Sequence, residues 1–305
     1  ISMALFLLLV LLPFTQSQNP AFDEDLARNV MMPLCSAAYT KNPQPCLDYK
    51  MSGAKVSMRV EVPCDDIDTD TCSGFTMVDE TRKRIGLVFR GTSTGDQLKD
   101  EIMTTLFENK TDFRDGGMTS PYFADAFDDL WFNSGLGADF LYLANKYPGY
   151  TLLITGHSLG GTFASLATVH ILVNKLFPAD QTIYYSLGEP RTGNKEFADL
   201  LDSLTVAYRI VHNKDVIPHV PFVHVMEYQH HKYEIYYAND MSEGQPNKLC
   251  KQQEDPTCSK KNVGDLVFNP DHLMYFNENL LNFGANACMS STPPPPPSPR
   301  PTRQA

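Results

Sequence analysis

The chain has 305 residues, of which 42% are hydrophobic and 20% charged, and its formal net charge is −11. This length suits one α/β domain of about 270 residues with extra segments at its ends, and the hydrophobic share is enough for a sizeable core. Such an acidic balance argues against nucleic-acid binding, or a polybasic grip on anionic membranes, as the main function.

The first residues predict export. The apolar run at 4–14 is too short to span a bilayer. Thr15 and Ser17 then place small side chains at the −3 and −1 positions of a cleavage site. We interpret residues 1–17 as a secretory signal peptide, although no Lys or Arg precedes the apolar run; a buried N-terminal helix is the alternative. The mature domain is then expected over residues 18–290.

The cysteines agree with export. Seven are present, at positions 35, 46, 64, 72, 250, 258 and 288. Two local pairs, 64 with 72 and 250 with 258, bracket short polar loops, and Cys288 is expected to pair with Cys35 or Cys46, which leaves one thiol over. No Cys-x2–4-Cys pair of the kind found in zinc sites is present. We therefore expect disulfides and no metal.

The predicted elements alternate between helices and buried strands. In chain order they are a helix over 21–40, a strand over 84–90, a helical stretch over 121–147, a strand over 150–155, a helix over 159–176, and strands over 182–187, 206–211 and 232–237. Gly135 and Gly137 are expected to interrupt the stretch over 121–147. This order predicts an α/β fold with a mostly parallel central sheet covered by helices on both faces.

The C-terminal segment has a different composition. Five consecutive prolines at 293–297 are followed by Ser-Pro-Arg-Pro, a pattern typical of polyproline II that cannot pack a core. We interpret residues 291–305 as a solvated, disordered tail. A recognition motif for a proline-binding module is the alternative.

The pattern Gly-x-Ser-x-Gly occurs twice. Around Ser158 it lies between a predicted buried strand and a predicted helix, the context of a nucleophile elbow, where the tight turn requires small neighbours. The second copy, Gly91 to Gly95, is followed by a polar segment without small residues for close packing. Ser158 is therefore the predicted nucleophile. Thr92, through its backbone N–H and hydroxyl, and the N–H of Leu159 are expected to form the oxyanion hole.

A catalytic acid and base should follow the serine in the order Asp or Glu, then His. Asp215 comes just after a predicted strand and before a proline-containing turn, which is a suitable position for the acid. For the base we favour His272, which follows a proline in a loop that is expected to lead into an apolar helix, over its rivals His219 and His224. The adjacent histidines at 230–231 are interpreted as a half-buried pair and not as metal ligands.

Five ordered motifs together resemble the class 3 lipases, the fungal-type triacylglycerol lipase family. They are Phe-Arg-Gly-Thr at 89–92, Gly-His-Ser-Leu-Gly-Gly at 156–161, Gly-Glu-Pro-Arg-Thr-Gly-Asn at 188–194, Asn-Lys-Asp-Val-Ile-Pro at 213–218 and Asp-His at 271–272. The resemblance runs from about Tyr39 to Phe283. It implies an α/β-hydrolase fold, with Ser158, Asp215 and His272 as the triad and Thr92 at the oxyanion position. The cysteine-rich insertions and the export signal are similar to those of secreted nematode members.

The family also implies a lid helix after the oxyanion strand, here over 97–109. Its apolar face would consist of Leu98, Ile102, Met103 and Leu106. An ordinary surface helix that packs on the core is the alternative. The single tryptophan, Trp131, lies outside this segment, so strong interfacial activation is not expected. Asn109 heads the sole glycosylation sequon, Asn-Lys-Thr.

The sequence thus predicts a secreted, monomeric serine ester hydrolase that acts on lipid esters at an oil–water or membrane interface through an acyl-enzyme. A triacylglycerol lipase is the first choice; a phospholipase A1, a monoacylglycerol lipase and a feruloyl-type esterase are alternatives. No cofactor, metal, nucleic acid or transmembrane anchor is expected. From other classes, an inactive hydrolase scaffold that binds lipid, or an interaction module built on the proline-rich tail, would also fit the chain.

Overall fold

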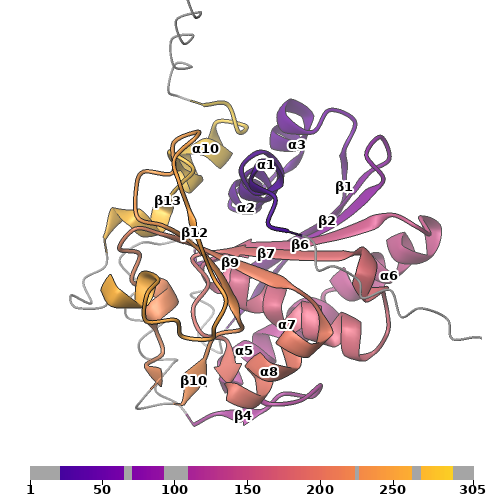
Figure 1. Ribbon diagram of the computed structural model, residues 1–305. Coiled ribbons are helices and arrows are strands. Elements are labelled where there is room, and N and C mark those ends of the chain that lie inside the picture. Colours follow the sequence, from indigo (N-terminus) through magenta and orange to yellow (C-terminus); the bar gives the residue numbers. More distant parts are fainter. Residues whose placement is uncertain (1–20, 65–70, 93–108, 224–226, 263–268, 291–305) are drawn as a thin grey trace, which may run out of the picture.

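The computed structural model describes residues 21–64, 71–92, 109–223, 227–262 and 269–290 (Figure 1). The predicted signal peptide, the proline-rich tail and the predicted lid residues Leu98, Ile102, Met103 and Leu106 lie outside the described residues. Within the described ranges, no helix has the length and apolar character needed to cross a membrane.

A mostly parallel sheet forms the centre of the described structure. Its strand order is β1-β2-β3-β6-β7-β9-β11-β12. The strands are β1 Lys55–Pro63, β2 Thr71–Asp79, β3 Arg84–Phe89, β6 Thr151–His157, β7 Thr182–Leu187, β9 Ala207–His212, β11 Tyr233–Tyr237 and β12 Lys248–Cys250. Strands β3 to β11 pair in parallel, whereas β1, β2 and β12 pair antiparallel at the two edges. The predicted α/β class is confirmed, but the prediction missed three strands of this sheet, β1, β2 and β12. Strand β1 is half-exposed and β12 has three residues, whereas β2 is buried but its sequence, Thr-Cys-Ser-Gly-Phe-Thr-Met-Val-Asp, has no continuous apolar run.

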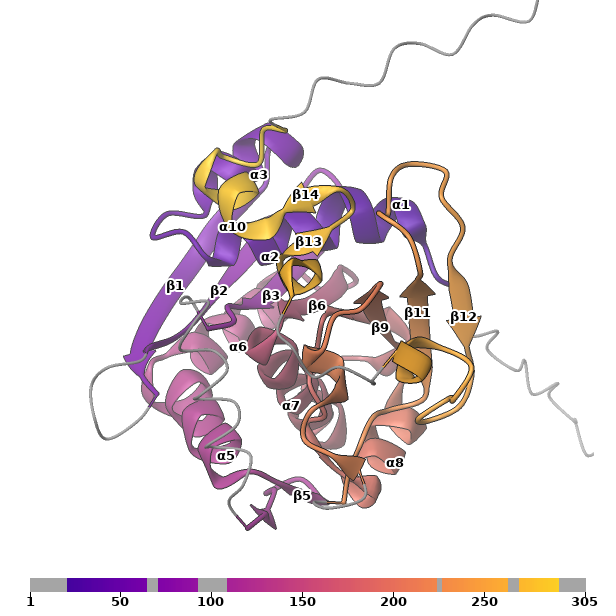
Figure 2. The ribbon, with the colours of Figure 1, turned by 90° about the vertical axis from the view of Figure 1, so that its left-hand side faces the viewer.

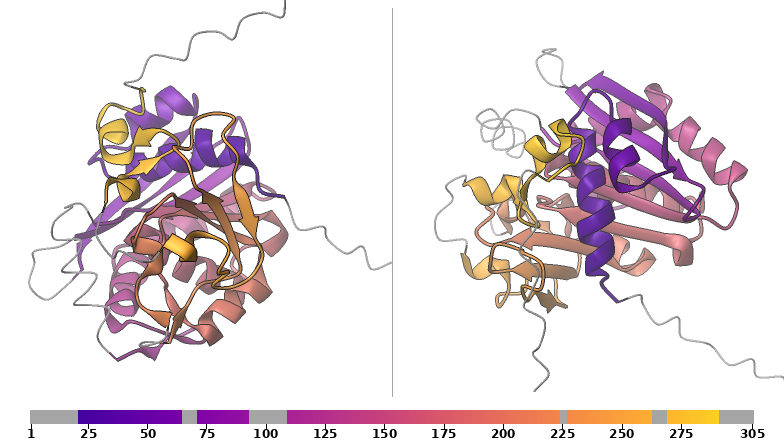
Figure 3. Two further views of the ribbon diagram at one scale, coloured as in Figure 1. Left: turned by 60° about the vertical axis from the view of Figure 1, so that its left-hand side comes forward. Right: turned by 90° about the horizontal axis from the view of Figure 1, so that it is seen from above.

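Helices cover both faces of this sheet (Figures 1 and 3). On one face lie α1 Glu24–Leu26, η1 Ala27–Met31, α2 Met32–Ala38, α3 Gln44–Lys50 and α10 Leu280–Ala285. On the other face lie α5 Pro121–Asp128, η2 Asp129–Asn133, α6 Leu136–Lys146, α7 Leu159–Val173 and α8 Lys195–Leu204. The helix predicted over 21–40 is present as a continuous segment from Glu24 to Ala38 with a π-helical turn inside it, and it runs across the strands (Figure 3).

The helical stretch over 121–147 breaks at one of its two glycines. Gly135 has a φ of 91° and stands between η2 and α6, so it ends one helix and begins the next. Gly137 lies inside α6, contrary to the prediction. A Cβ at Gly137 would overlap the Trp131 backbone and indole. Close packing, and not a helix break, therefore explains the glycine at 137.

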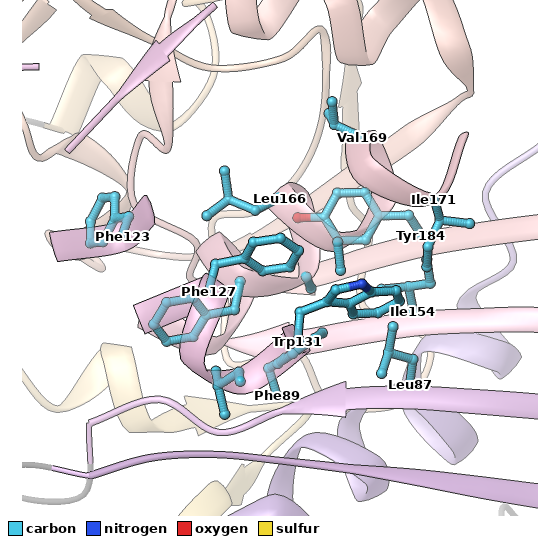
Figure 4. Packing of buried hydrophobic residues seen from close by; sticks show 14 of the residues in the cluster. Leu87, Phe89, Phe123, Phe127, Trp131, Ile154, Leu166, Val169, Ile171 and Tyr184 are labelled. Atoms are coloured by element: carbon cyan, nitrogen blue, oxygen red, sulfur yellow. The ribbon is translucent and has the colours of Figure 1, made fainter. Parts of the chain in front are cut away.

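Buried side chains form a core on each face of the sheet. Between the sheet and helices α5 and α7, Phe127 stacks on Trp131, and both pack toward strand residues such as Leu87 and Ile154 (Figure 4). Full burial of a side chain of this size stabilises the fold by about 1.5–3 kcal/mol. Helix α7 is buried along almost its whole length, so the turn that precedes it is fixed by packing on every side.

Short elements complete the described structure. They are a sheet ordered β10-β8-β5-β4, made of Tyr228–Gln229, Gly193–Asn194, Met118–Thr119 and Thr111–Asp112, a hairpin of β13 Met274–Tyr275 and β14 Glu278–Asn279, and the 3-10 turns η3 Ala179–Gln181, η4 Ile217–His219, η5 Ser259–Asn262 and η6 Pro270–Leu273. His272 is therefore followed by a hairpin, and not directly by the apolar helix that the sequence led us to expect.

Three disulfides join six of the seven cysteines. The local pairs Cys64–Cys72 and Cys250–Cys258 are confirmed. The long-range pair is Cys46–Cys288, which connects α3 to the C-terminal end of the domain across 242 residues. Cys35 is the remaining thiol; it is buried, and burial raises its pKa to about 12.

Candidate active site

The candidate catalytic residues come together where the parallel strands end. Ser158 follows β6, Asp215 follows β9, Thr92 follows β3, and His272 lies in the turn η6. Figure 2 views the molecule from this end of the sheet. In open α/β sheets, sites form at the carboxyl ends of the strands. The fold thus places residues separated by up to 180 positions at a single edge, as 272 − 92 = 180.

Ser158 occupies a strained turn between β6 and α7. Its φ is 57° and its ψ is −132°, a region that residues with a side chain rarely adopt. The backbone on both sides passes very close to neighbouring chain: a Cβ at Gly156 would overlap the Gly160 carbonyl, and a Cβ at Gly160 would overlap the backbone at Phe89. This geometry is that of a nucleophile elbow.

The Ser158 hydroxyl is available for chemistry. Its Oγ is buried and makes no hydrogen bond within the described part of the chain. The backbone N–H donates to the Leu187 carbonyl at 2.9 Å, which fixes the turn. The hydroxyl stands at the start of α7, where the first N–H groups of a helix have no partner inside the helix and favour negative charge.

His272 and Asp215 form a fully buried pair. The Nδ1 atom of His272 lies 3.0 Å from both carboxylate oxygens of Asp215. Because a carboxylate can only accept, Nδ1 carries the proton, and in the neutral ring the lone pair is then on Nε2. This is the tautomer that a general base needs if it is to act through Nε2.

Two further donors support the Asp215 carboxylate. The Tyr275 hydroxyl donates to Oδ2 at 2.7 Å, and the Ile217 N–H donates to Oδ1 at 3.0 Å. Burial raises the pKa of Asp215, but the nearby His272 and these hydrogen bonds outweigh burial and leave that pKa below its usual value. Asp215 is therefore ionised. Gly188, with a φ of 59°, makes room for the pair, because a Cβ there would meet Asp215 Oδ2 at 2.8 Å.

A second histidine, His157, supports the His272–Asp215 pair. His157 Nε2 lies 2.7 Å from the His272 carbonyl, and its Nδ1 lies 2.7 Å from the Tyr39 hydroxyl. A carbonyl only accepts, so Nε2 donates and Nδ1 accepts from Tyr39. Burial, with the His272 charge as a second cause, lowers the pKa of His157 to about 3. His157 is a neutral support for the backbone of His272, and sequence reasoning found neither this role nor Tyr39.

The candidate oxyanion residues lie on neighbouring chain ends. Strands β3 and β6 pair in parallel with Phe89 opposite Gly156, and a Cβ at Gly91 would lie 3.0 Å from Ser158 Cβ. Thr92, the next residue, is buried, as is Leu159 at the first position of α7. Asn109, the candidate glycosylation site, is exposed just before β4.

No other histidine among the described residues donates to the Asp215 carboxylate. Among the described residues, the side-chain and backbone donors to the Asp215 carboxylate are His272, Tyr275 and Ile217, so His219 is not its partner. His224 lies outside the described residues. The pair at 230–231 is buried, more deeply than predicted. No grouping of His, Cys, Asp and Glu suited to a metal occurs in the ranges that the structure covers.

Comparison with known proteins agrees with this fold. The family model "Lipase (class 3)" matches residues 86–225. A lipase of Caenorhabditis elegans is 32% identical over 303 residues, which cover 89% of this chain and 84% of that protein. A secreted mono- and diacylglycerol lipase of Fusarium solani is 31% identical over 158 residues, 51% of this chain and 44% of that protein, so the chain matches less than half of this fungal relative.

A solved structure shares the fold. A triacylglycerol lipase, described as having a serine-protease triad at its catalytic centre, superimposes with a TM-score of 0.72 at 22% sequence identity, over 86% of this chain and 97% of the other. Together, the match to the family and the nematode relative at this coverage show the ancestry of the chain. The protein is an enzyme with an α/β-hydrolase fold that belongs to the class 3 lipase family.

Proposed function

We propose that this enzyme is a secreted lipase that hydrolyses lipid esters with Ser158 as nucleophile, His272 as base and Asp215 as acid. The observation that carries the proposal is a strained, buried serine at the start of α7, at the same sheet edge as a buried His–Asp hydrogen bond. No metal or cofactor enters the mechanism.

The first half of the reaction transfers the acyl group to the enzyme. His272 Nε2 takes the proton from Ser158 Oγ while Oγ attacks the ester carbonyl carbon, and the carbonyl oxygen becomes an oxyanion. The Asp215 carboxylate stabilises the imidazolium through Nδ1. When the tetrahedral intermediate collapses, the bond to the alcohol oxygen breaks, and His272 gives its proton to the departing alcohol. The product is an acyl-enzyme.

The second half releases the acid. Water replaces the alcohol, His272 takes one of its protons, and the hydroxide oxygen attacks the acyl carbon. Collapse returns the proton to Ser158 Oγ and frees the fatty acid. In both halves, the N–H groups of Thr92 and Leu159, with the Thr92 hydroxyl, would hold the oxyanion. One such donor contributes roughly 10²–10³ in kcat in enzymes of this type.

The proposed substrate is triacylglycerol at an oil–water or membrane interface. The enzyme is proposed to act as a monomer. Support comes from the relatives, since one is described as a triacylglycerol lipase and another as a mono- and diacylglycerol lipase. Secretion is supported by the three disulfides, which persist in oxidising compartments. The exposed Asn109 is proposed to carry an N-glycan.

The test is an ester series measured beside two serine variants. The chain from Gln18 onward is assayed on p-nitrophenyl esters from acetate to palmitate, and on emulsified triolein. Two variants are assayed beside it: Ser158→Ala, and Ser93→Ala at the serine of the second Gly-x-Ser-x-Gly copy. We expect activity that rises toward long chains and emulsions and that is lost only in Ser158→Ala. Activity confined to short esters would move the substrate to a soluble ester. Phospholipid cleavage in preference to triolein would favour a phospholipase, and no ester hydrolysis would favour an inactive lipid-binding protein.

A further inference from the structure

One acidic side chain of the loop closed by the Cys250–Cys258 disulfide points into the protein. This loop follows β12, which lies beside β11 at the edge of the sheet (Figure 2). Glu254, in the middle of the loop, has a φ of 53°, and its side chain is 10% exposed. Its two carboxylate oxygens accept from Arg191 Nε at 2.7 Å and from Arg191 Nη2 at 2.6 Å. This bidentate arrangement is the strongest form of Arg–carboxylate contact.

The other end of the Arg191 guanidinium holds the segment that carries the candidate acid. We call residues 215–221 the acid loop. Arg191 Nη1 donates to the carbonyls of His219 and Pro221, the latter at 2.8 Å. The Arg191 backbone N–H donates to the Val220 carbonyl at 2.9 Å. Arg191 thus fixes three consecutive carbonyls at the end of the acid loop.

Glu254 supports the acid loop by a second route. Its Oε1 also accepts from the His230 N–H at 3.1 Å. The Nε2 atom of His230 lies 2.6 Å from the Pro218 carbonyl, which must be the acceptor. Arg191 and His230, whose side chains donate to carbonyls of the acid loop, are therefore both bonded to the Glu254 carboxylate, Arg191 through its guanidinium and His230 through its backbone N–H.

The charges around this contact are mostly positive. Arg191 is buried, and a buried guanidinium that loses its carboxylate is strongly destabilising. Lys260 Nζ lies 3.7 Å from Glu254 Oε2, and Arg209 acts on the same carboxylate at longer range. Two buried histidines, His219 and His230, lie nearby, and burial lowers the pKa of each, to about 4 for His219; Asp215 acts on His219, and His231 acts on His230. Glu254 is therefore the carboxylate that balances Arg191.

We propose that Glu254 is a positioning residue that holds Asp215 in place through Arg191, and that the Cys250–Cys258 disulfide keeps Glu254 in position for this contact. The inference rests on the proposed triad, in which Asp215 is the acid. It extends the catalytic machinery to a surface loop whose residues do not contact the reacting atoms.

A single substitution separates this role from general stabilisation. Glu254→Gln keeps the size of the side chain but leaves the Arg191 charge without its carboxylate. The acid loop then shifts, the Asp215–His272 contact weakens, and kcat falls roughly 10- to 100-fold. Both the unbalanced positive charge and the weaker Asp215 contact disfavour the His272 imidazolium. The fall of kcat/KM on the acid side of its pH profile, which we call the acid limb, therefore moves to lower pH.

The matched control is Asp255→Asn, the same kind of change at the next residue of the loop. The Asp255 carboxylate accepts only from Thr257, within the loop, among the hydrogen bonds that the structure describes. kcat, KM and the pH profile are measured with a soluble p-nitrophenyl ester, together with the melting temperature. We expect Asp255→Asn to retain wild-type kcat and the wild-type acid limb. A Glu254→Gln enzyme that loses melting temperature but keeps both quantities would overturn the proposal.

A charge-conserving variant and the disulfide give independent tests. Glu254→Asp keeps the negative charge, so its acid limb should return to the wild-type pH even if kcat stays reduced. If Glu254→Gln does not fold, Cys250→Ala/Cys258→Ala reaches the same contact without removing a charge, and it should lower kcat and displace the acid limb. Cys64→Ala/Cys72→Ala, which opens a loop of the same separation, should leave the acid limb in place. If the two double variants have the same pH profile, the proposed role of the Cys250–Cys258 disulfide is wrong.

The same assays distinguish this inference from the proposed function. If Ser158→Ala retains wild-type activity, the triad itself is wrong, and the positioning role of Glu254 toward a catalytic Asp215 is wrong with it. If Ser158→Ala is inactive while Glu254→Gln matches the wild type in kcat and pH profile, the triad stands and the positioning role of Glu254 is wrong.

Discussion

The Tyr275 hydroxyl donates to Asp215 Oδ2 at 2.7 Å, while Nδ1 of His272 lies 3.0 Å from the same oxygen. The candidate acid is thus held from two sides by residues three positions apart in the sequence. Because all three side chains are buried, each of these contacts acts without competition from water, and removal of one donor should be measurable.

Tyr275→Phe tests the support of the acid. The change removes the hydroxyl and keeps the ring, so Asp215 loses one donor and its pKa rises toward the usual value. A buried hydrogen bond to a charged group contributes about 1.5–3 kcal/mol to stability, and we expect a loss of that size in urea unfolding. Because Asp215 is then less firmly oriented toward His272, kcat should fall roughly tenfold. Tyr142→Phe, at a side chain that is 56% exposed, is the control and should change neither quantity.

Asp215→Asn tests the tautomer of the base. An amide can donate to Nδ1 of His272, which would place the imidazole proton on Nε2 and prevent that atom from accepting the Ser158 proton. We expect kcat to fall by about 10⁴-fold while the fold is retained. Turnover and the circular dichroism spectrum are measured together. A folded Asp215→Asn enzyme with nearly full activity would rule out Asp215 as the acid.

Two variants of the nucleophile test the strain at the elbow. Ser158→Gly and Ser158→Ala should both be inactive, but only glycine adopts a φ of 57° with a ψ of −132° without cost. We expect Ser158→Gly to be more stable than Ser158→Ala by about 1 kcal/mol or more in denaturant unfolding. Equal stabilities, or a more stable alanine variant, would contradict a strained elbow.

The Glu254–Arg191 contact should make stability depend on acid pH. Burial raises the pKa of Glu254, but its hydrogen bonds to Arg191 and the charge of that residue outweigh burial and lower the pKa from 4.5 to about 2. A group with a depressed folded pKa stabilises the fold above its unfolded pKa. Its contribution is therefore complete above pH 4.5 and disappears as the pH falls toward 2.

The comparison between wild type and Glu254→Gln isolates this contribution. The difference in the free energy of unfolding between the two proteins should be constant near neutral pH and should shrink as the solution is acidified through this window. Urea unfolding at a series of pH values measures it. A difference that does not vary with pH would mean that the charge on Glu254 contributes nothing to stability.

Features that depend on residues close together in the chain could be predicted from the amino-acid order alone. The apolar runs of β3, β6, β7 and β9 are continuous because parallel strands are buried on both faces, so they could be identified without any structure. The elbow at Ser158 was also evident, because the strained turn requires glycines at fixed offsets within five residues. Asp215 was found from its position after a strand, and His272 was chosen over its rivals chiefly through the ordered motifs of the family.

Contacts between residues far apart in the chain could not be predicted without the fold. Tyr39 reaches His157 across 118 positions, Tyr275 reaches Asp215 across 60, and Cys288 pairs with Cys46 and not with Cys35. No periodicity or local spacing marks such partners, because packing of the helices against the sheet brings them together. The contact of Glu254 with Arg191 has the same origin: a hydrogen bond between distant residues needs both positions and both orientations fixed, and those are properties of the folded chain.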